Sequence, residues 1–414
     1  MISYSKALQI INKTKLKILN QKVSINESLN RISAENIYSK TIYPSANNTA
    51  FDGFAIKTSE TRNLSRTKSK KFKILKTIAA GDNPIIKNYQ KNSTVEIMTG
   101  GIIPKYYDSI IPIEKIKFYP SKTKPTHIIV EEMLSKHMYV RFAGTDYKMK
   151  DLIIKKGEII EPKHIMAFVT LGLKHILVKK KPKIIFISTG DELVDYKKNK
   201  KINPWQLRNS NNHYLISLKN YIPCKIIDGG IIKDSQPKKL KQKIKKISKS
   251  DIDIVLTSGA VSAGKFDFVP NIVRDSGIKT CFKNVAIRPG KPIMFGKFKK
   301  KNKVFFGLPG NPISSAACFR FFVYPLIRNS LGMKKELKFK TRLKGKFEKK
   351  KKFTRFLKGI SNIDKNGKIE LKILKGQESF KIKSLVSANV WAIFKSGQEK
   401  FKKNDLIDCI TLNL

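Results

Sequence analysis

Three turn-rich motifs follow or adjoin short apolar runs between Asp253 and Ser314: SGAVSAG (258–264), RPGKP (288–292) and GLPGNP (307–312). Strand ends followed by glycine-rich turns are the places where open α/β sheets bind ligands. The same stretch supplies Asp267, Arg288 and Lys291. It therefore predicts a site for an anionic ligand with a bound cation beside it.

Upstream of this stretch, apolar runs alternate with helical patterns. Strands are predicted over 184–188, 225–231 and 252–257, and helices are predicted from Asn212 and over 236–247. In the second helix, Leu240, Ile244 and Ile247 form one apolar stripe, and lysines occupy the remaining positions. Strands that alternate with helices predict a parallel, doubly wound sheet with right-handed crossovers.

The rest of the chain shows other patterns of apolar and polar residues. Residues 1–40 and 163–173 show helical spacing, residues 41–140 contain short β-type runs, and Lys- and Phe-rich alternation follows Gly332. These changes predict a multidomain α/β protein with the following parts: a helical and linker domain of residues 1–40 and 141–180, a β insert domain of 41–140, an α/β domain of 181–330 and a C-terminal β domain of 335–414.

The formal net charge is +54 over 414 residues. Because lysines are interleaved with apolar residues along the whole chain, we interpret them as solvated surface and expect no specific nucleic-acid partner.

Four scattered cysteines without a C-x-x-C pair argue against a thiolate metal site and for a reducing compartment. The N-terminus lacks a signal-peptide core, and the apolar run 313–327 is too short to span a bilayer. We expect a soluble, cytoplasmic protein.

The GLPGNP motif predicts a helix start. Asn311 suits the N-cap, Pro312 suits the first helical position, and Pro309 lies in the tight turn before them. The free N–H groups near Ser314 and the helix dipole favour an anion there.

Carboxylates follow the predicted strand ends. Asp191 and Glu192 come directly after the strand 184–188; a helix-capping role is an equally good interpretation of Asp191, whereas Glu192 and Asp267 would share one sheet edge. Oxygen ligands without His or Cys favour Mg²⁺. Asp234 follows a neighbouring strand in the same way.

Other polar residues suit a ligand clamp. Asn209 and Ser210 fit either a helix N-cap or a clamp, and Ser258, Gly259 and Ser262 belong to the glycine-rich turn. No nucleophile-elbow pattern surrounds the serines, so the sequence disfavours serine catalysis.

Taken together, the motifs resemble the molybdopterin molybdenumtransferase family, whose animal counterpart is the E domain of gephyrin. The resemblance rests on six ordered segments: FDGFA (51–55), MTGG (98–101) with Pro104, STGDEL (188–193), SGAVSAG with Asp267, RPGKP and GLPGNP. It implies insertion of molybdate into adenylylated molybdopterin with Mg²⁺-dependent release of AMP. It also implies an elongated homodimer whose α/β domain is similar to molybdopterin adenylyltransferase and whose last domain is a β-barrel.

The resemblance assigns roles residue by residue. It implies an active cleft between the α/β domain of one subunit and the insert and helical segment of the other. Its catalytic acids would be Asp52, Asp146, Glu192 and Asp267, with Glu192 and Asp267 as metal ligands. Its substrate-binding residues would be Asn209, Ser210, Asp234, Ser258, Gly259, Ser262, Arg288, Lys291, Pro309 and Asn311.

This chain departs from the family pattern at Ala260, where the family usually has a second glycine. A turn that requires a positive φ would be strained there by the Cβ atom. Two other functions remain as alternatives: the related adenylyltransferase, and a non-enzymatic scaffold or polyanion-binding protein.

Overall fold

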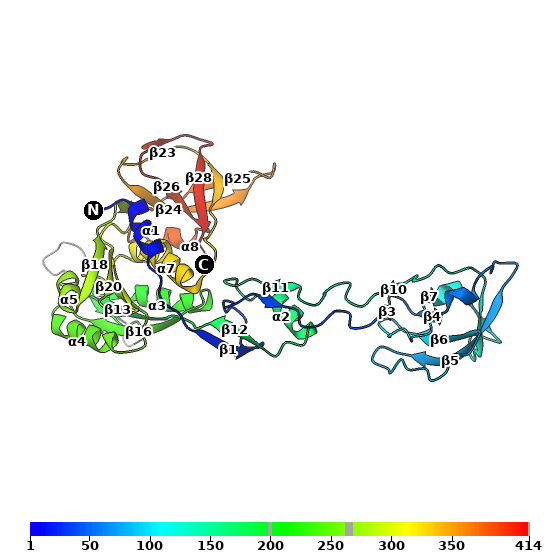
Figure 1. Cartoon of the computed structure of the whole chain (residues 1–414). Helices are drawn as coiled ribbons and strands as arrows, with labels where there is room; N and C mark the ends of the chain where they lie inside the picture. Colours follow the sequence, from blue (N-terminus) through cyan, green and yellow to red (C-terminus); the bar gives the residue numbers. More distant parts are fainter. Residues whose placement is uncertain (198–200, 261–267, 413–414) are drawn as a thin grey trace.

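The computed structural model describes residues 1–197, 201–260 and 268–412. The chain is elongated (Figure 1). The α/β domain and the C-terminal barrel lie together at one end, the β insert lies at the other end, and a narrow linker joins them. Within one chain, the insert is therefore remote from the α/β sheet.

The α/β domain is built on a mixed sheet. Its strands, in spatial order, are β16 (Lys225–Ile232), β13 (Lys183–Thr189), β17 (Ile254–Ser258), β21 (Val304–Leu308), β20 (Met294–Phe298) and β18 (Ile278–Lys283). The first four are parallel, whereas β20 runs antiparallel to both of its neighbours. The α/β fold is confirmed, but the prediction of a parallel sheet is wrong at β20. The turn between β20 and β21 is too short for the crossover that parallel pairing requires.

Helices cover both faces of this sheet because successive strand residues point in opposite directions. In β13, Ile184 and Phe186 pack in the same core as α3 (Ser210–Ser217) and α6 (Pro312–Cys318). Ile185 and Ile187 pack in the core that contains α4 (Pro237–Ser248) and α5 (Val269–Asp275). The buried residues of α4 are Leu240, Ile244 and Ile247, which confirms the predicted stripe.

A buried helical run joins the α/β domain to the barrel. It comprises α6, a π-helix (Phe319–Val323) and α7 (Tyr324–Leu331). The ring of Phe321 stacks on Phe356 of the barrel at a centroid separation of 3.7 Å. The guanidinium of Arg320, 3% exposed, donates to both carboxylate oxygens of Glu336 at 2.8 and 2.5 Å. Within the described ranges, no helix has the length and apolarity to cross a membrane.

The C-terminal domain is a closed barrel, as predicted. Its strands, in spatial order, are β24 (Thr354–Ile363), β25 (Ile369–Ile373), β22 (Phe339–Leu343), β28 (Leu406–Thr411) and β26 (Val390–Phe394), and β26 pairs again with β24. A short pair, β23 (Phe347–Glu348) with β27 (Lys400–Phe401), and α8 (Lys383–Val386) complete it. From the α/β domain, β19 (Ile287–Arg288) pairs in parallel with β24.

The β insert is a separate sheet with its own cores. Its strands, in spatial order, are β7 (Ser109–Pro112), β4 (Gly53–Ile56), β6 (Ser93–Ile97), β5 (Lys70–Ile78), β9 (His127–Val130) and β8 (Lys117–Tyr119), with 3-10 turns at Thr58–Glu60 and Ile113–Lys115. It joins the linker where β3 (Asn48–Thr49) pairs antiparallel with β10 (Val140–Arg141).

The linker brings together segments from either side of the insert. It pairs β1 (Asn20–Ser24) with β12 (His175–Lys179) and β2 (Ile37–Tyr38) with β11 (Leu152–Ile154), beside α2 (Pro162–Thr170). Only α1 (Tyr4–Lys13) is helical within residues 1–40, so the prediction of helix over that whole segment is wrong. The partners of β1 and β2 lie more than a hundred residues away in sequence, so local periodicity does not reveal them. Helix α1 itself packs in the α/β core through Ala7 and Ile11.

The turn after β17 is tightly constrained. Gly259 has φ +102°, and a Cβ atom there would lie 2.4 Å from the carbonyl oxygen of Thr189. Ala260 follows with φ +50°. The turn does require a positive φ at Ala260, and this alanine occupies the left-handed region that L-residues disfavour.

Replacing Ala260 with glycine should stabilise the α/β domain by about 0.5–1 kcal/mol, because relief of the Cβ clash outweighs the larger backbone entropy lost by glycine. Urea unfolding followed through the α/β-domain transition measures the change. Gln242→Gly, at an exposed position in the middle of α4, should have the opposite sign and cost about 0.5–1 kcal/mol. Equal destabilisation by both substitutions would contradict the assignment of strain.

Candidate active site

A pocket of about 680 Å³ opens at the carboxyl edge of the α/β sheet. It is lined by Thr189, Gly190, Glu192, Leu193, Leu207, Arg208, Asn209, Ser210, Asn211, Asp234, Ser258, Gly259, Ala260, Pro292, Pro309, Gly310, Asn311, Pro312, Phe380 and Ile382. Eight of the residues predicted from sequence are among them: Glu192, Asn209, Ser210, Asp234, Ser258, Gly259, Pro309 and Asn311. The turns after β13, β17 and β21 thus form one site.

Hydrogen bonds between these turns fix the floor of the pocket. The N–H of Gly259 donates to the carbonyl of Leu308 at 3.1 Å, and the Thr189 hydroxyl donates to the carbonyl of Ser258 at 3.1 Å. The Ser258 hydroxyl in turn donates to the carbonyl of Pro309 at 3.3 Å. These hydrogen bonds therefore fix the three strand-end turns relative to one another.

Two asparagines connect α3 to this floor. Asn209 is the N-cap residue of α3, but its side chain makes no capping bond; its Oδ1 instead accepts from the Ser188 hydroxyl at 2.9 Å. Asn211 donates through Nδ2 to the Ser258 hydroxyl at 3.0 Å and to the carbonyl of Gly310 at 2.6 Å. The amides hold the pocket walls together and leave the backbone turns to face the ligand.

The predicted helix start at GLPGNP is confirmed. Asn311 is the N-cap of α6, and proline occupies the first turn. The side chain of Asn311 makes no capping bond. The N–H of Ile313 donates to the carbonyl of Ser379 in the C-terminal domain at 3.1 Å, so one amide of the first turn is already used.

Two carboxylates, from Glu192 and Asp234, line the same pocket. Lys233 holds the Asp191–Leu193 loop by donating its Nζ to the carbonyls of Asp191 and Leu193. Asp191 is not a lining residue; its Oδ1 accepts from the Ser235 hydroxyl at 3.3 Å.

The C-terminal domain supplies an apolar wall, Phe380 and Ile382, that sequence reasoning missed. This wall depends on Lys358, which is fully buried and donates its Nζ to the carbonyls of Gly376 at 2.8 Å and Lys381 at 3.0 Å. Burial lowers the pKa of Lys358 to about 8. No local pattern indicates this wall, because it arises only when the barrel docks on α6.

Several predicted residues do not line this pocket. Arg288 lies on β19 with its guanidinium 4.7 Å from the Phe353 ring centroid, and Lys291 is exposed; only the adjacent Pro292 lines the pocket. Ser262 and Asp267 lie outside the described residues.

Asp52 and Asp146 lie in the insert and in the linker segment. Asp52 accepts from the N–H and hydroxyl of Thr99 at 2.6 and 2.8 Å, and these bonds lower its pKa. Within a single chain, the structure does not bring either acid to Glu192.

Comparisons with known proteins point to one family along nearly the whole chain. Family models match at residues 2–172 (MoeA N-terminal region, domain I and II), 185–329 (probable molybdopterin binding domain) and 340–412 (MoeA C-terminal region, domain IV). The molybdopterin molybdenumtransferase of Haemophilus influenzae is 30% identical over 376 residues, which cover 90% of this chain and 89% of the relative. The enzyme of the same name from Staphylococcus epidermidis is 28% identical over 417 residues, covering 99% and 95%.

The fold agrees as well. The molybdopterin biosynthesis moeA protein from Pyrococcus horikosii superposes with a TM-score of 0.83 and 26% identity, covering 100% of both chains. Fold and site thus define an enzyme of molybdenum cofactor biosynthesis, a transferase. The chain belongs to the molybdopterin molybdenumtransferase family.

Lys358 gives a pH-dependent prediction. Its pKa is about 8 in the folded protein and 10.5 in the unfolded chain, so the unfolded state binds more protons between these values. The free energy of unfolding of the wild type should therefore rise relative to Lys358→Met as the pH increases from about 8 towards 10.5. Chemical unfolding over this pH range measures the difference. Lys365→Met, at an exposed position, should follow the wild type; a constant offset between wild type and Lys358→Met would contradict the lowered pKa.

Proposed function

We propose that this protein inserts molybdate into the dithiolene of adenylylated molybdopterin and releases AMP, and that the pocket at the carboxyl edge of the α/β sheet holds the substrate. The observation that carries this proposal is the convergence there of three strand-end turns, the start of α6 and two carboxylates. Its volume of about 680 Å³ suits a small molecule of nucleotide size.

The described residues favour catalysis by positioning. In the reaction, an oxygen of water or molybdate displaces AMP at phosphorus, and the dithiolene sulfurs take the place of molybdate oxygen, which leaves as water. Neither step requires a protein nucleophile. Ser258, the serine in the floor of the pocket, is engaged by Pro309 and Asn211. Fixed backbone dipoles and charges then supply the stabilisation of developing charge.

A cation is needed because Glu192 and Asp234 face a substrate that is itself negative. In the described part of the chain, no group of three or more His, Cys, Asp or Glu residues is arranged to hold a metal. This fits Mg²⁺, which retains several waters and binds through one or two carboxylates together with phosphate oxygens. We propose that Glu192 and Asp267 hold Mg²⁺, whose chemistry there is to neutralise the phosphate.

A second copy of the chain would complete the site. Asp52 and Asp146 lie away from the pocket of their own chain, and the linker exposes many large apolar side chains. These are Leu29, Tyr38, Ile42, Tyr43, Met149, Leu152, Met166 and Val169. We propose a homodimer in which the linkers pack together, so that each insert brings its acids to the pocket of the other chain.

The alternatives explain less. An adenylyltransferase has no evident use for the β insert and the C-terminal barrel, and the barrel forms one wall of the pocket. A scaffold has no need of carboxylates grouped at a sheet edge in a chain with a net charge of +54.

The cysteines are free, and all but Cys281 are buried, which supports a reducing, cytoplasmic location.

The purified protein, supplied with adenylylated molybdopterin, molybdate and Mg²⁺, should release AMP and reconstitute an apo-molybdoenzyme. Glu192→Gln should reduce the rate of AMP release by about 10- to 100-fold, because the pocket loses a charged ligand for the cation. Asp191→Asn is the matched control and should stay near the wild-type rate, since Asp191 does not line the pocket. Absence of both products in the wild type would exclude the transferase.

Mixing two impaired variants tests the shared site, because Asp52→Asn and Glu192→Gln should each slow AMP release strongly. In a heterodimer of Asp52→Asn and Glu192→Gln chains, one pocket combines the intact Glu192 of the first with the intact Asp52 of the second. After unfolding and refolding together in equal amounts, random pairing should restore about a quarter of the wild-type AMP-release activity. Each variant refolded alone is the control. No recovery in a mixture shown to contain heterodimers would rule out a site built from two chains.

A further inference from the structure

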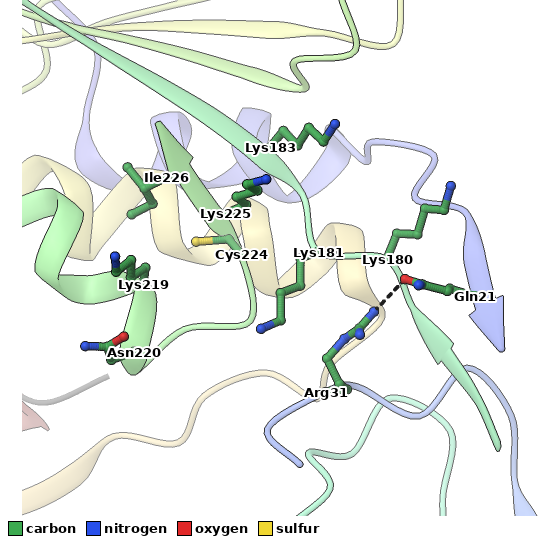
Figure 2. Close-up of a pocket in the computed structure, with 10 residues that line it drawn as sticks. All are labelled: Gln21, Arg31, Lys180, Lys181, Lys183, Lys219, Asn220, Cys224, Lys225 and Ile226. Atoms are coloured by element: carbon green, nitrogen blue, oxygen red, sulfur yellow. Dashed lines mark hydrogen bonds between the residues drawn. The ribbon is translucent and has the colours of Figure 1, made fainter. Parts of the chain in front are cut away.

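A second pocket, of about 610 Å³, lies at the opposite edge of the α/β sheet, where the linker meets the domain (Figure 2). Strand β13 connects the two sites: Lys183, at its start, lines this second pocket, and Thr189, at its end, lines the candidate active site. The second pocket, hereafter the basic pocket, is lined by Gln21, Arg31, Lys180, Lys181, Lys183, Lys219, Asn220, Cys224, Lys225 and Ile226.

The basic pocket concentrates positive charge. Six of its ten lining residues are Lys or Arg, whereas 85 of the 414 residues in the chain are. No carboxylate is among the lining residues. Of the six cations, Lys183 forms an ion pair with Asp251, and the salt bridges found in the described residues include none of the other five. The remaining charges repel one another, and a bound anion would relieve that repulsion.

Arg31 distinguishes this pocket from a solvated lysine surface. Its side chain is 8% exposed, and its Nη2 donates to the Gln21 side chain at 3.1 Å and to the carbonyl of Lys179 at 3.0 Å. Within the described residues, its Nε is buried without a hydrogen-bond partner. The nearby carboxylate, Glu27, is instead bonded to Ser24. The buried, incompletely bonded guanidinium therefore adds a positive charge at the wall of the pocket, which favours an anion there.

The residues come from both sides of the domain boundary. Gln21, Arg31 and Lys180 belong to the linker, and Lys219 and Lys225 belong to the α/β domain. In Figure 2, Lys181 extends into the space between Arg31 and the Lys219 segment. The amino groups of Lys180 and Lys183 point away from this space. The cations that border it are few and lie close to a pocket of about 610 Å³, which suits a compact anion with several charges better than an extended strand.

We propose that the basic pocket binds a small anion that carries consecutive phosphoryl groups, and that this anion bridges the linker and the α/β domain. The site is separate from the proposed catalytic pocket. Its occupancy can therefore be measured without the transferase reaction.

Tripolyphosphate is the probe, and isothermal titration of the full-length protein at physiological salt gives its affinity and stoichiometry. One equivalent should bind per chain. The double variant Lys181→Gln/Lys219→Gln should bind at least about tenfold more weakly, because two charge–charge contacts are lost. Both lysines are exposed, so their replacement leaves the fold intact. Lys122→Gln/Lys124→Gln, in the insert, removes the same charge from exposed positions and should bind like the wild type.

ATP titrated without Mg²⁺ separates two sources of the phosphate chain. Affinity equal to that of tripolyphosphate indicates a free polyphosphate, and higher affinity that is lost in Lys181→Gln/Lys219→Gln indicates a nucleotide. Equal weakening in both double variants would show diffuse attraction by the net charge and overturn the proposal. It would also be overturned if a short single-stranded DNA bound more tightly than tripolyphosphate and lost its affinity in the Lys181→Gln/Lys219→Gln variant.

Discussion

The burial of one helical run between two domains is the constraint on which the rest of this structure depends. Residues 312–331 pack against the α/β sheet on one side and against the barrel on the other, in a single continuous core. The stacking of Phe321 on Phe356 and the Arg320–Glu336 pair fix the barrel on this run. Because the run begins at the pocket, the same contacts that hold the domains together also place Phe380 beside the strand-end turns that line it.

Local sequence patterns predicted the features that depend only on residues close together in the chain. The stripe of α4, the N-cap at Asn311 and the strained Ala260 all follow from spacing or from backbone preference. Features that depend on distant partners escaped prediction. Strands β1 and β2 form only because segments after the insert pair with them, and Phe380 reaches the pocket only through domain docking. Asp267 cannot be compared, since it lies outside the described residues.

The positions of the charged residues say more about the two pockets of the α/β domain than the net charge of the chain does. A chain of +54 places two of its 31 carboxylates, Glu192 and Asp234, in the pocket at the carboxyl edge of the sheet. At the amino edge, the lining of the basic pocket includes six cations and no carboxylate, and Asp251 pairs with one of those cations, Lys183. Carboxylates at the first pocket would favour a cation beside an anionic substrate, as proposed above, whereas the cations at the second would favour an anion directly. The pocket at the start of β13 is therefore lined by more cations than the pocket at its end.

The attachment of the insert has a consequence for the modularity of the chain. At β3 and β10 the outgoing and returning segments pair antiparallel, with Thr49 opposite Val140 and Asn48 opposite Arg141. Paired strands bring their backbones within about 5.5 Å, a gap that a two-residue hairpin closes. The two connections of the insert therefore run side by side at β3 and β10, so a short hairpin at this position would be long enough to join them if the insert were removed.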